Sequence, residues 1–146
     1  MIQLRSEHLA AFENQYEAAL VDRVVRHVQT DQAAIIGGFP QSLVREMVEN
    51  GLARARRYGL TWESSLTAFV SLMFQVAPNF DEQPAIHRVL TDKRLSPNDR
   101  IDALLTRVRE RHWRDAQRHY NERAWFPELY DDDNDAPLVR IRWIRK

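Results

Sequence analysis

Apolar side chains recur at spacings of three and four residues along most of this chain, and that period is typical of amphipathic α-helices. The first run follows Ser6, a residue type favoured at helix N-caps, and predicts a helix that extends to about Gln29. The apolar positions of this helix are Leu9, Phe12, Tyr16, Leu20, Val24 and Val28.

Two more helices are predicted in the middle of the chain. One opens at Pro40 or Gln41 and ends before Gly59, which fits the left-handed C-cap position because it has no Cβ. Thr61 is the expected N-cap of the next helix, which Pro78 ends. Apolar residues cover more than one face of the helix between Thr61 and Pro78, so we expect that helix to be central and largely buried.

The last two predicted helices lie between residues 81 and 123. Asp81 is expected to cap a short helix that reaches Leu90. Ser96 and Pro97 are residue types preferred at the N-cap and at the first helical position. From there the helical period continues to about Arg123, so the sequence predicts about five helices in all.

The pattern changes after Arg123. Four large apolar residues surround a proline, an acidic run follows, and the last residues alternate between apolar and basic side chains, which is the two-residue period of a β-strand. The apolar positions of this segment are Trp125, Phe126, Leu129, Tyr130, Val139, Ile141 and Trp143. We therefore predict a mainly α single-domain bundle at residues 1–123 and a C-terminal arm at residues 124–146 that ends in a short strand.

Composition narrows the classes of protein that fit this pattern. The chain has 146 residues, a length typical of one domain, and its lack of cysteine excludes disulfides, thiolate metal sites and a cysteine nucleophile. The N-terminal residues lack the order of a signal peptide, and no apolar run approaches the roughly 18 residues of a membrane span. We expect a cytoplasmic protein without a membrane partner.

The charge of the chain is balanced, with 21 basic and 21 acidic residues. Proteins dedicated to nucleic acid usually carry a basic excess that displaces counterions, so we expect no nucleic-acid partner. The predicted last helix does hold several arginines interleaved with Trp113 and Tyr120, an arrangement that suits nucleic acid, an acidic protein surface or the chain's own acidic run at residues 131–135. Zero net charge disfavours the first of these readings.

Residue types that carry catalysis form no familiar constellation in this sequence. His112, Asp115 and His119 share one face of a predicted helix, but they span two turns, about 10 Å, and converge poorly on one ion. The sequence shows neither a glycine-rich phosphate loop nor a G-x-S-x-G or H-E-x-x-H motif. We therefore expect a protein that is not an enzyme and holds no metal or cofactor.

A pattern of turn and packing residues between about Leu43 and Leu105 resembles short helical proteins encoded in bacterial type VI secretion clusters, near the VgrG spike and PAAR tip proteins. It reads G-(three)-A-(two)-Y-G, then an aromatic-Leu-Met run, then P-x-F-D-x-x-P and L-x-P-x-x-R. The positions are Gly51, Ala55, Tyr58, Gly59, Phe69, Leu72, Met73, Pro78, Phe80, Asp81, Pro84, Leu95, Pro97 and Arg100.

The resemblance implies an accessory role without chemistry, in which the protein escorts a secreted effector or loads it onto the spike. The alternative is an immunity protein that binds and neutralises a cognate toxin, for which the acidic stretch at residues 128–135 could imitate nucleic-acid phosphates. Both roles require another protein as the partner, either an effector or toxin or a component of the spike.

Three arrangements of the C-terminal arm remain open from the sequence. Its seven apolar residues can form the partner surface, because aromatic residues and arginine are enriched at binding hot spots and a lone strand can extend the edge of a partner's sheet. Alternatively, the arm folds back on the helices and its strand pairs with an extended piece at residues 33–39. The third arrangement is a symmetric homodimer that exchanges strands.

Overall fold

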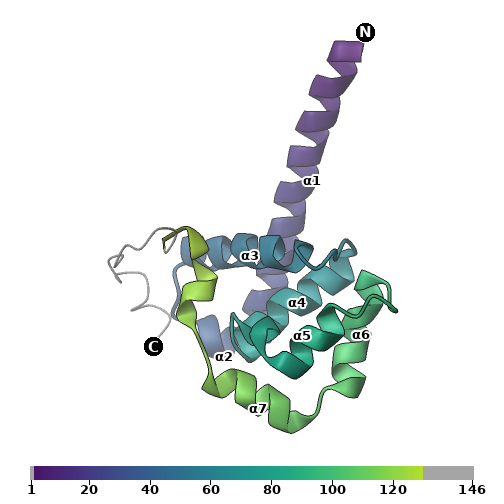
Figure 1. Cartoon of the computed structure of the whole chain (residues 1–146). Coiled ribbons are helices and arrows are strands. Elements are labelled where there is room, and N and C mark those ends of the chain that lie inside the picture. The colour runs from purple at the N-terminus through teal and green to yellow at the C-terminus, as the bar shows by residue number, and fades with distance from the viewer. Residues whose placement is uncertain (1, 130–146) are drawn as a thin grey trace.

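The computed structural model describes the backbone of residues 2–129 and the side chains of residues 7–129. This part of the chain is helical throughout and contains no strand, which confirms the mainly α prediction for these residues (Figure 1). The α-helices are α1 (Ile2–Asp31), α2 (Ala33–Ile36), α3 (Gln41–Arg56), α4 (Glu63–Gln75), α5 (Pro84–Leu90), α6 (Pro97–Arg107) and α7 (Glu110–Arg118). The 3-10 helices are η1 (Phe80–Glu82), η2 (Glu122–Trp125) and η3 (Pro127–Leu129).

Helix α4 lies at the centre of the core, as its apolar sequence predicts. Phe69, Val70 and Met73 are fully buried on this helix. It packs against α3, α1 and α6. Gly51 of α3 allows a close approach to α4, because a Cβ at that position would lie 3.1 Å from a methyl group of Val70.

Helix α1 extends well beyond the body on which it packs (Figure 1). Its C-terminal half contacts α3 and α4, whereas its N-terminal half projects away from all the other helices (Figure 1). The helix ends at Asp31, close to the predicted end, but it begins at Ile2, so Ser6 lies inside it and is not an N-cap.

The predicted helix at residues 96–123 is wrong as one element, because it is divided into α6 and α7. Val108 adopts an extended conformation, with φ −83° and ψ 128°, and its side chain is buried. The break turns α7 back under the body, where the Trp113 ring lies 6.2 Å from the Phe80 ring and Ala116 is buried. Burial of these apolar groups outweighs the local preference for one longer helix.

Two predicted caps are corrected by the structure. The N-cap of α4 is Trp62 and not Thr61, and both backbone N–H groups donate to Oδ1 of Asn98, at 3.2 and 3.1 Å. Helix α5 is capped by Gln83, whose Oε1 accepts from two backbone N–H groups, whereas Asp81 is buried and used elsewhere. Residues 33–36, which the fold-back arrangement of the arm would require to be extended, form α2.

The left-handed conformation predicted for Gly59 is confirmed, but the C-cap of α3 is Arg57, two residues earlier. Gly59 has a φ of +83°, a left-handed conformation that costs an L-residue about 1–2 kcal/mol. A Cβ at this position would also lie 3.1 Å from Cγ of Pro97. The glycine therefore lets the end of α3 pack closely against the start of α6.

Candidate protein-binding surface

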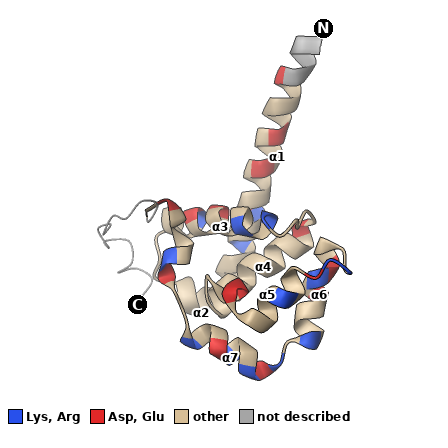
Figure 2. Ribbon diagram, in the orientation of Figure 1, with Lys and Arg blue, Asp and Glu red and all other residues tan. Residues whose placement is uncertain are grey.

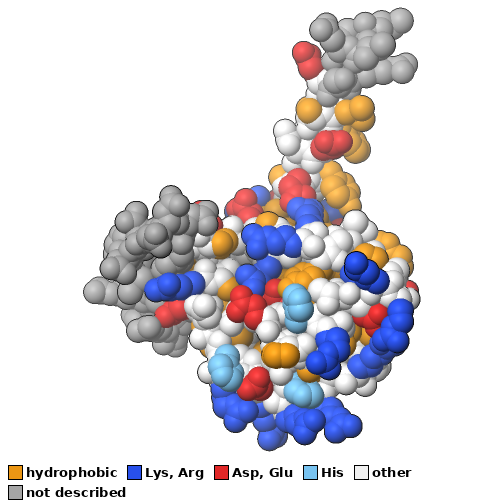
Figure 3. Space-filling model, viewed as in Figure 1, with side chains coloured by type: hydrophobic (Ala, Val, Ile, Leu, Met, Phe, Trp, Pro, Cys, Tyr) orange, Lys and Arg blue, Asp and Glu red, His pale blue; other side chains and the backbone are white. Residues whose placement is uncertain are grey.

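Residues 7–19 form the part of α1 that projects from the body, and we call this segment the α1 extension. Leu9, Phe12 and Tyr16 lie at i, i+3 and i+7, so they share one face of the helix. Their exposed fractions are 60%, 68% and 56%. Figure 3 shows apolar side chains along one edge of the projecting helix. We call these three residues the apolar stripe.

The same helix buries its apolar residues almost completely from one turn later onward. Leu20, Val24 and Val28 have exposed fractions of 2%, 1% and 0%. The row of apolar positions is continuous in sequence, but only its second half has a core to join. The stripe therefore consists of core-type side chains that no described part of this chain covers.

Ion pairs fix the direction in which the extension leaves the body. Glu17 accepts two hydrogen bonds of 2.8 Å from the guanidinium of Arg56 on α3. Arg23 donates to Glu63 at the start of α4, with the shortest contact at 2.7 Å. The hydrogen bond from Arg56 lowers the pKa of Glu17, and that from Arg23 lowers the pKa of Glu63. Both carboxylates are therefore charged at neutral pH.

Anchoring also explains how the extension remains helical with few tertiary contacts. Isolated helices shorter than about 12–15 residues are marginal in water because nucleation is costly. Here the buried half of α1 already supplies the nucleus, so the extension only propagates a formed helix. Its residues include Ala10, Ala11, Ala18 and Ala19, and alanine has the highest intrinsic helix propensity.

The residues predicted to bind a partner occupy different places. Trp125 and Phe126 have exposed fractions of 1% and 0%, so they belong to the core and not to a partner surface. The Trp125 ring lies 4.6 Å from that of Phe74, its indole N–H donates to the hydroxyl of Tyr120, and its carbonyl accepts from Asn50. The first residues of the predicted arm thus fold back on the helices.

The rest of the predicted surface is partly covered or outside the described residues. Leu129 is half-buried and packs against the core. The remaining positions, Tyr130, Val139, Ile141 and Trp143, fall in residues 130–146, outside the part of the chain that the structure describes. The predicted strand, its pairing and the acidic run lie there as well.

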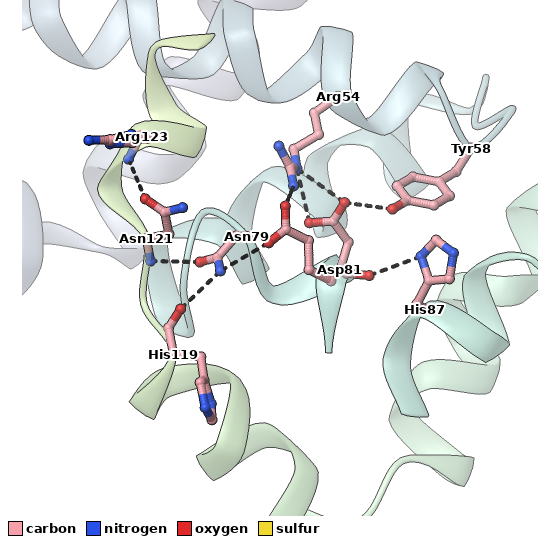
Figure 4. Close-up of polar contacts among 9 residues, drawn as sticks. Arg54, Tyr58, Asn79, Asp81, His87, His119, Asn121 and Arg123 are labelled. Carbon is pink, nitrogen blue, oxygen red and sulfur yellow. Dashed lines mark hydrogen bonds and ion pairs between the residues drawn. The ribbon is translucent and has the colours of Figure 1, made fainter. Parts of the chain in front are cut away.

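A second polar site joins α7 to the body. A cleft of about 380 Å³ is lined by Asn79, Glu82, Gln83, Asp115 and His119, among others. Most of its polar groups are bound to one another: Asn79 donates to the carbonyl of His119, and Gln83 donates to Asp115 (Figure 4 shows the first of these). These hydrogen bonds hold α7 against the body. The polar groups that line the cleft therefore serve the packing of α7.

The predicted metal-ligand candidates His112, Asp115 and His119 lie on α7 and at its C-cap, where local contacts account for the two that are paired. His119 contacts Asp115 at 3.3 Å, and Asp115 also lies 3.6 Å from Arg118. Within residues 2–129, no group of three or more histidine or carboxylate side chains is arranged to hold a metal ion. Several arginines of this region also pair with acids, among them Arg114 with Glu110 and Arg107 with Asp92.

The residues of the family-like pattern form the framework of the body. Asp81, almost fully buried, accepts from Arg54 at 2.9 Å and from the Tyr58 hydroxyl at 2.6 Å (Figure 4). Burial, together with this hydrogen bond to a carboxylate, raises the pKa of Tyr58 well above its usual value. Arg100 donates to the carbonyls of Tyr58, Leu90 and Asp92. These contacts fix the positions of α3, η1, α5 and α6.

Within the described residues, none of the helices combines the length and the apolar composition that crossing a bilayer requires. Comparison of the chain with protein-family models, with curated proteins and with solved structures finds no match. The candidate site therefore rests on geometry and on the residues themselves.

Proposed function

We propose that this chain is a non-enzymatic accessory factor that binds another protein through the α1 extension. The observation that carries the proposal is the exposed apolar stripe on a helix that the body holds away from itself. Burying a side chain such as Leu or Phe contributes about 1.5–3 kcal/mol, and aromatic side chains are frequent binding hot spots. A partner that covers all three side chains therefore gains affinity without any rearrangement of the body.

The specific role that we propose is that of a type VI secretion adaptor or chaperone, which escorts an effector or loads it onto the spike. Several residues that resemble the family, among them Gly59, Asp81 and Arg100, have structural roles in the body. Such a division supports the proposal, because it leaves the extension available to suit a particular partner. The partner would be the effector itself or a component of the spike.

An immunity protein is the second candidate, and one observation favours it. The extension carries Glu7, Glu13 and Glu17 but no Lys or Arg. Toxins that cleave nucleic acid need basic surfaces to bind phosphates, so an acidic helix suits them as a target. A toxicity-rescue assay separates the two roles, because an immunity protein must protect cells from the free toxin and an adaptor does not.

The proposal is tested by recovering the partner from the native host with matched variants. The double variant Phe12→Ser, Tyr16→Ser removes both aromatic side chains of the stripe, whereas the control Asn14→Ser, Ala18→Ser introduces two serines at other exposed positions of the same segment. We expect the first variant to lose the partner, the second to keep it, and both to unfold at the wild-type temperature. Equal recovery by the two variants contradicts the proposal.

A third sample tests the C-terminal arm separately. Truncation after Leu129 keeps the buried Trp125 and Phe126 but removes Tyr130, Val139, Ile141 and Trp143. If the partner is recovered equally by this chain, the last 17 residues (130–146) are not the binding element. If recovery is lost while the stripe variant still binds, the arm and not the extension is the docking surface.

A further inference from the structure

We propose that the occupant of the apolar stripe is a basic amphipathic helix of a different protein, and not a second copy of this chain. The inference rests on the proposed function and specifies the chemistry of the partner. It is carried by the charge of the extension, by the position of Glu13 and by the consequence of pairing two extensions.

The extension differs in charge from the rest of the chain. Residues 7–19 include three glutamates and no Lys or Arg, although the whole chain has 21 acidic and 21 basic residues. Figure 2 shows acidic positions and no basic ones along the coloured part of the projecting helix. The nearest basic residues in sequence are Arg5 and Arg23, and Arg23 is bound to Glu63. The extension is therefore a local acidic surface.

Glu13 lies at the edge of the stripe and makes no hydrogen bond or ion pair with the described residues. Successive helical residues are rotated by about 100°, so Glu13 lies beside Leu9 and Tyr16, four and three residues away, on one side of the stripe. Glu17 lies further round the helix and already binds Arg56. Glu7 falls on the opposite side of the helix from the stripe. The carboxylate available to a helix docked on the stripe is thus that of Glu13.

Pairing with a second copy would be opposed by these charges. In an antiparallel pair that covers both stripes, residues on the same edge of each helix face one another, so the Glu13 side chains of the two copies approach. Like charges in such flanking positions are destabilising, and the extension supplies no Lys or Arg to relieve them. A partner helix with basic flanks replaces this repulsion by attraction.

The spacing of the stripe indicates a helix as the occupant. Leu9 and Tyr16 are separated by seven residues, or about 10.5 Å along the axis. Apolar residues at i, i+3 and i+7 match the a and d positions of a second helix, and this is a common mode of peptide recognition. The partner segment is expected to repeat this spacing and to place Lys or Arg beside it.

The test uses two synthetic helical peptides of identical length. Both carry leucine at the a and d positions, but one has lysine and the other glutamate in the flanking positions. Affinities are measured for the full-length wild type, for Glu13→Arg and for Glu7→Arg. The last variant is the matched control, because it changes the charge equally on the face away from the stripe. Sedimentation of the protein alone measures self-association.

We expect the lysine peptide to bind the wild type at least tenfold more tightly than the glutamate peptide at low salt, with a smaller difference at high salt. Glu13→Arg should lower the affinity for the lysine peptide about fivefold, and Glu7→Arg should lower it less than twofold. Equal binding of the two peptides, binding of neither, or a dimer that Phe12→Ser dissociates would overturn the inference.

Failure of this inference can be distinguished from failure of the proposed function. If the stripe variant loses its partner from the native host while Glu13→Arg behaves like Glu7→Arg, the docking function stands and the basic chemistry is wrong. If the stripe variant keeps its partner, the proposed function itself fails.

Discussion

The two halves of α1 belong to one continuous helix but meet different surroundings. From Leu20 onward the apolar side chains are valine and leucine packed against α3 and α4, whereas the extension has Leu9, Phe12 and Tyr16 in solvent. The comparison teaches that apolar spacing identifies a face that needs to be covered, but does not say what covers it. In one half the cover is the protein's own core. In the other we propose that it is a partner.

The polar contacts of the two regions differ in the same way. Those of the body are closed, because Arg54, Asp81 and Tyr58 satisfy one another with little exposure to water. In the extension only Glu17 is paired, and Glu7 and Glu13 make no hydrogen bond or ion pair with the described residues, so their charge is open to water. A closed network stabilises the fold, and an open one leaves charge available for binding.

The largest expected effect comes from making the same Phe→Ala mutation in each region and comparing the losses of stability. Phe69→Ala should lower the free energy of unfolding by about 3–5 kcal/mol, because it leaves a cavity in the core. Phe12→Ala should change it by less than about 0.5 kcal/mol, because the ring is already in water. Denaturant unfolding of the two variants measures the difference. A large loss with Phe12→Ala would show that the extension packs on the body.

Trp125→Ala tests whether the start of the predicted C-terminal arm belongs to the body. We expect a loss of about 3–4 kcal/mol, since the indole is buried beside Phe74 and its N–H donates to Tyr120. The measurement is again equilibrium unfolding, with Tyr120→Phe as a control that removes only the hydrogen-bonding hydroxyl. Unchanged stability together with lost partner binding would restore the surface role that the sequence suggested.

Asp81→Ala examines the closed polar network. Removing the carboxylate leaves Arg54 with only Glu82, so we expect a loss of about 2–3 kcal/mol. The pKa of Tyr58 should fall toward its usual value, because the hydroxyl loses an acceptor that holds its proton. Spectrophotometric titration of the tyrosines follows this change. Glu82→Gln is the control, and it should cost much less because Glu82 is largely exposed.

The smallest expected effect is the pH dependence of the junction between the two regions. Because Arg56 lowers the pKa of Glu17 in the folded state, the ion pair stabilises the fold above the ordinary value of 4.5. This contribution is lost as pH falls through the lowered value. Exposure limits it to about 0.5 kcal/mol. The Arg56→Gln variant should have a Glu17 pKa closer to 4.5, because the cation that lowers it is gone, and NMR titration measures this change. An unchanged pKa would refute the pairing.

Much of the fold is predictable from the sequence because helical period, proline and glycine act locally. The central position of α4 and the left-handed Gly59 follow from such signals. The break at Val108 does not, because the apolar period continues through Trp113 and Ala116. The break exists because packing α7 against η1 buries more apolar surface than one longer helix would. That burial depends on residues distant in sequence, such as Phe80 for Trp113.

The candidate site was harder to predict for the same reason. The sequence places Leu9, Phe12 and Tyr16 in one row with buried residues, and only the end of the body at α3 decides where burial stops. A signal was present: acidic residues and alanines accompany the exposed half, whereas valines dominate the buried half. Trp125 and Phe126 were interpreted as surface because local sequence does not reveal the space beside Phe74 that receives the indole.

The most direct test of the central claim is site-specific photo-crosslinking in the native host. A photoreactive phenylalanine analogue replaces Phe12 in one chain and Asn14, on another face of the extension, in a second. We predict a covalent adduct from position 12 to a helical segment of a different protein, and none from position 14. An adduct only to another copy of this chain, or no adduct from position 12, would contradict the account.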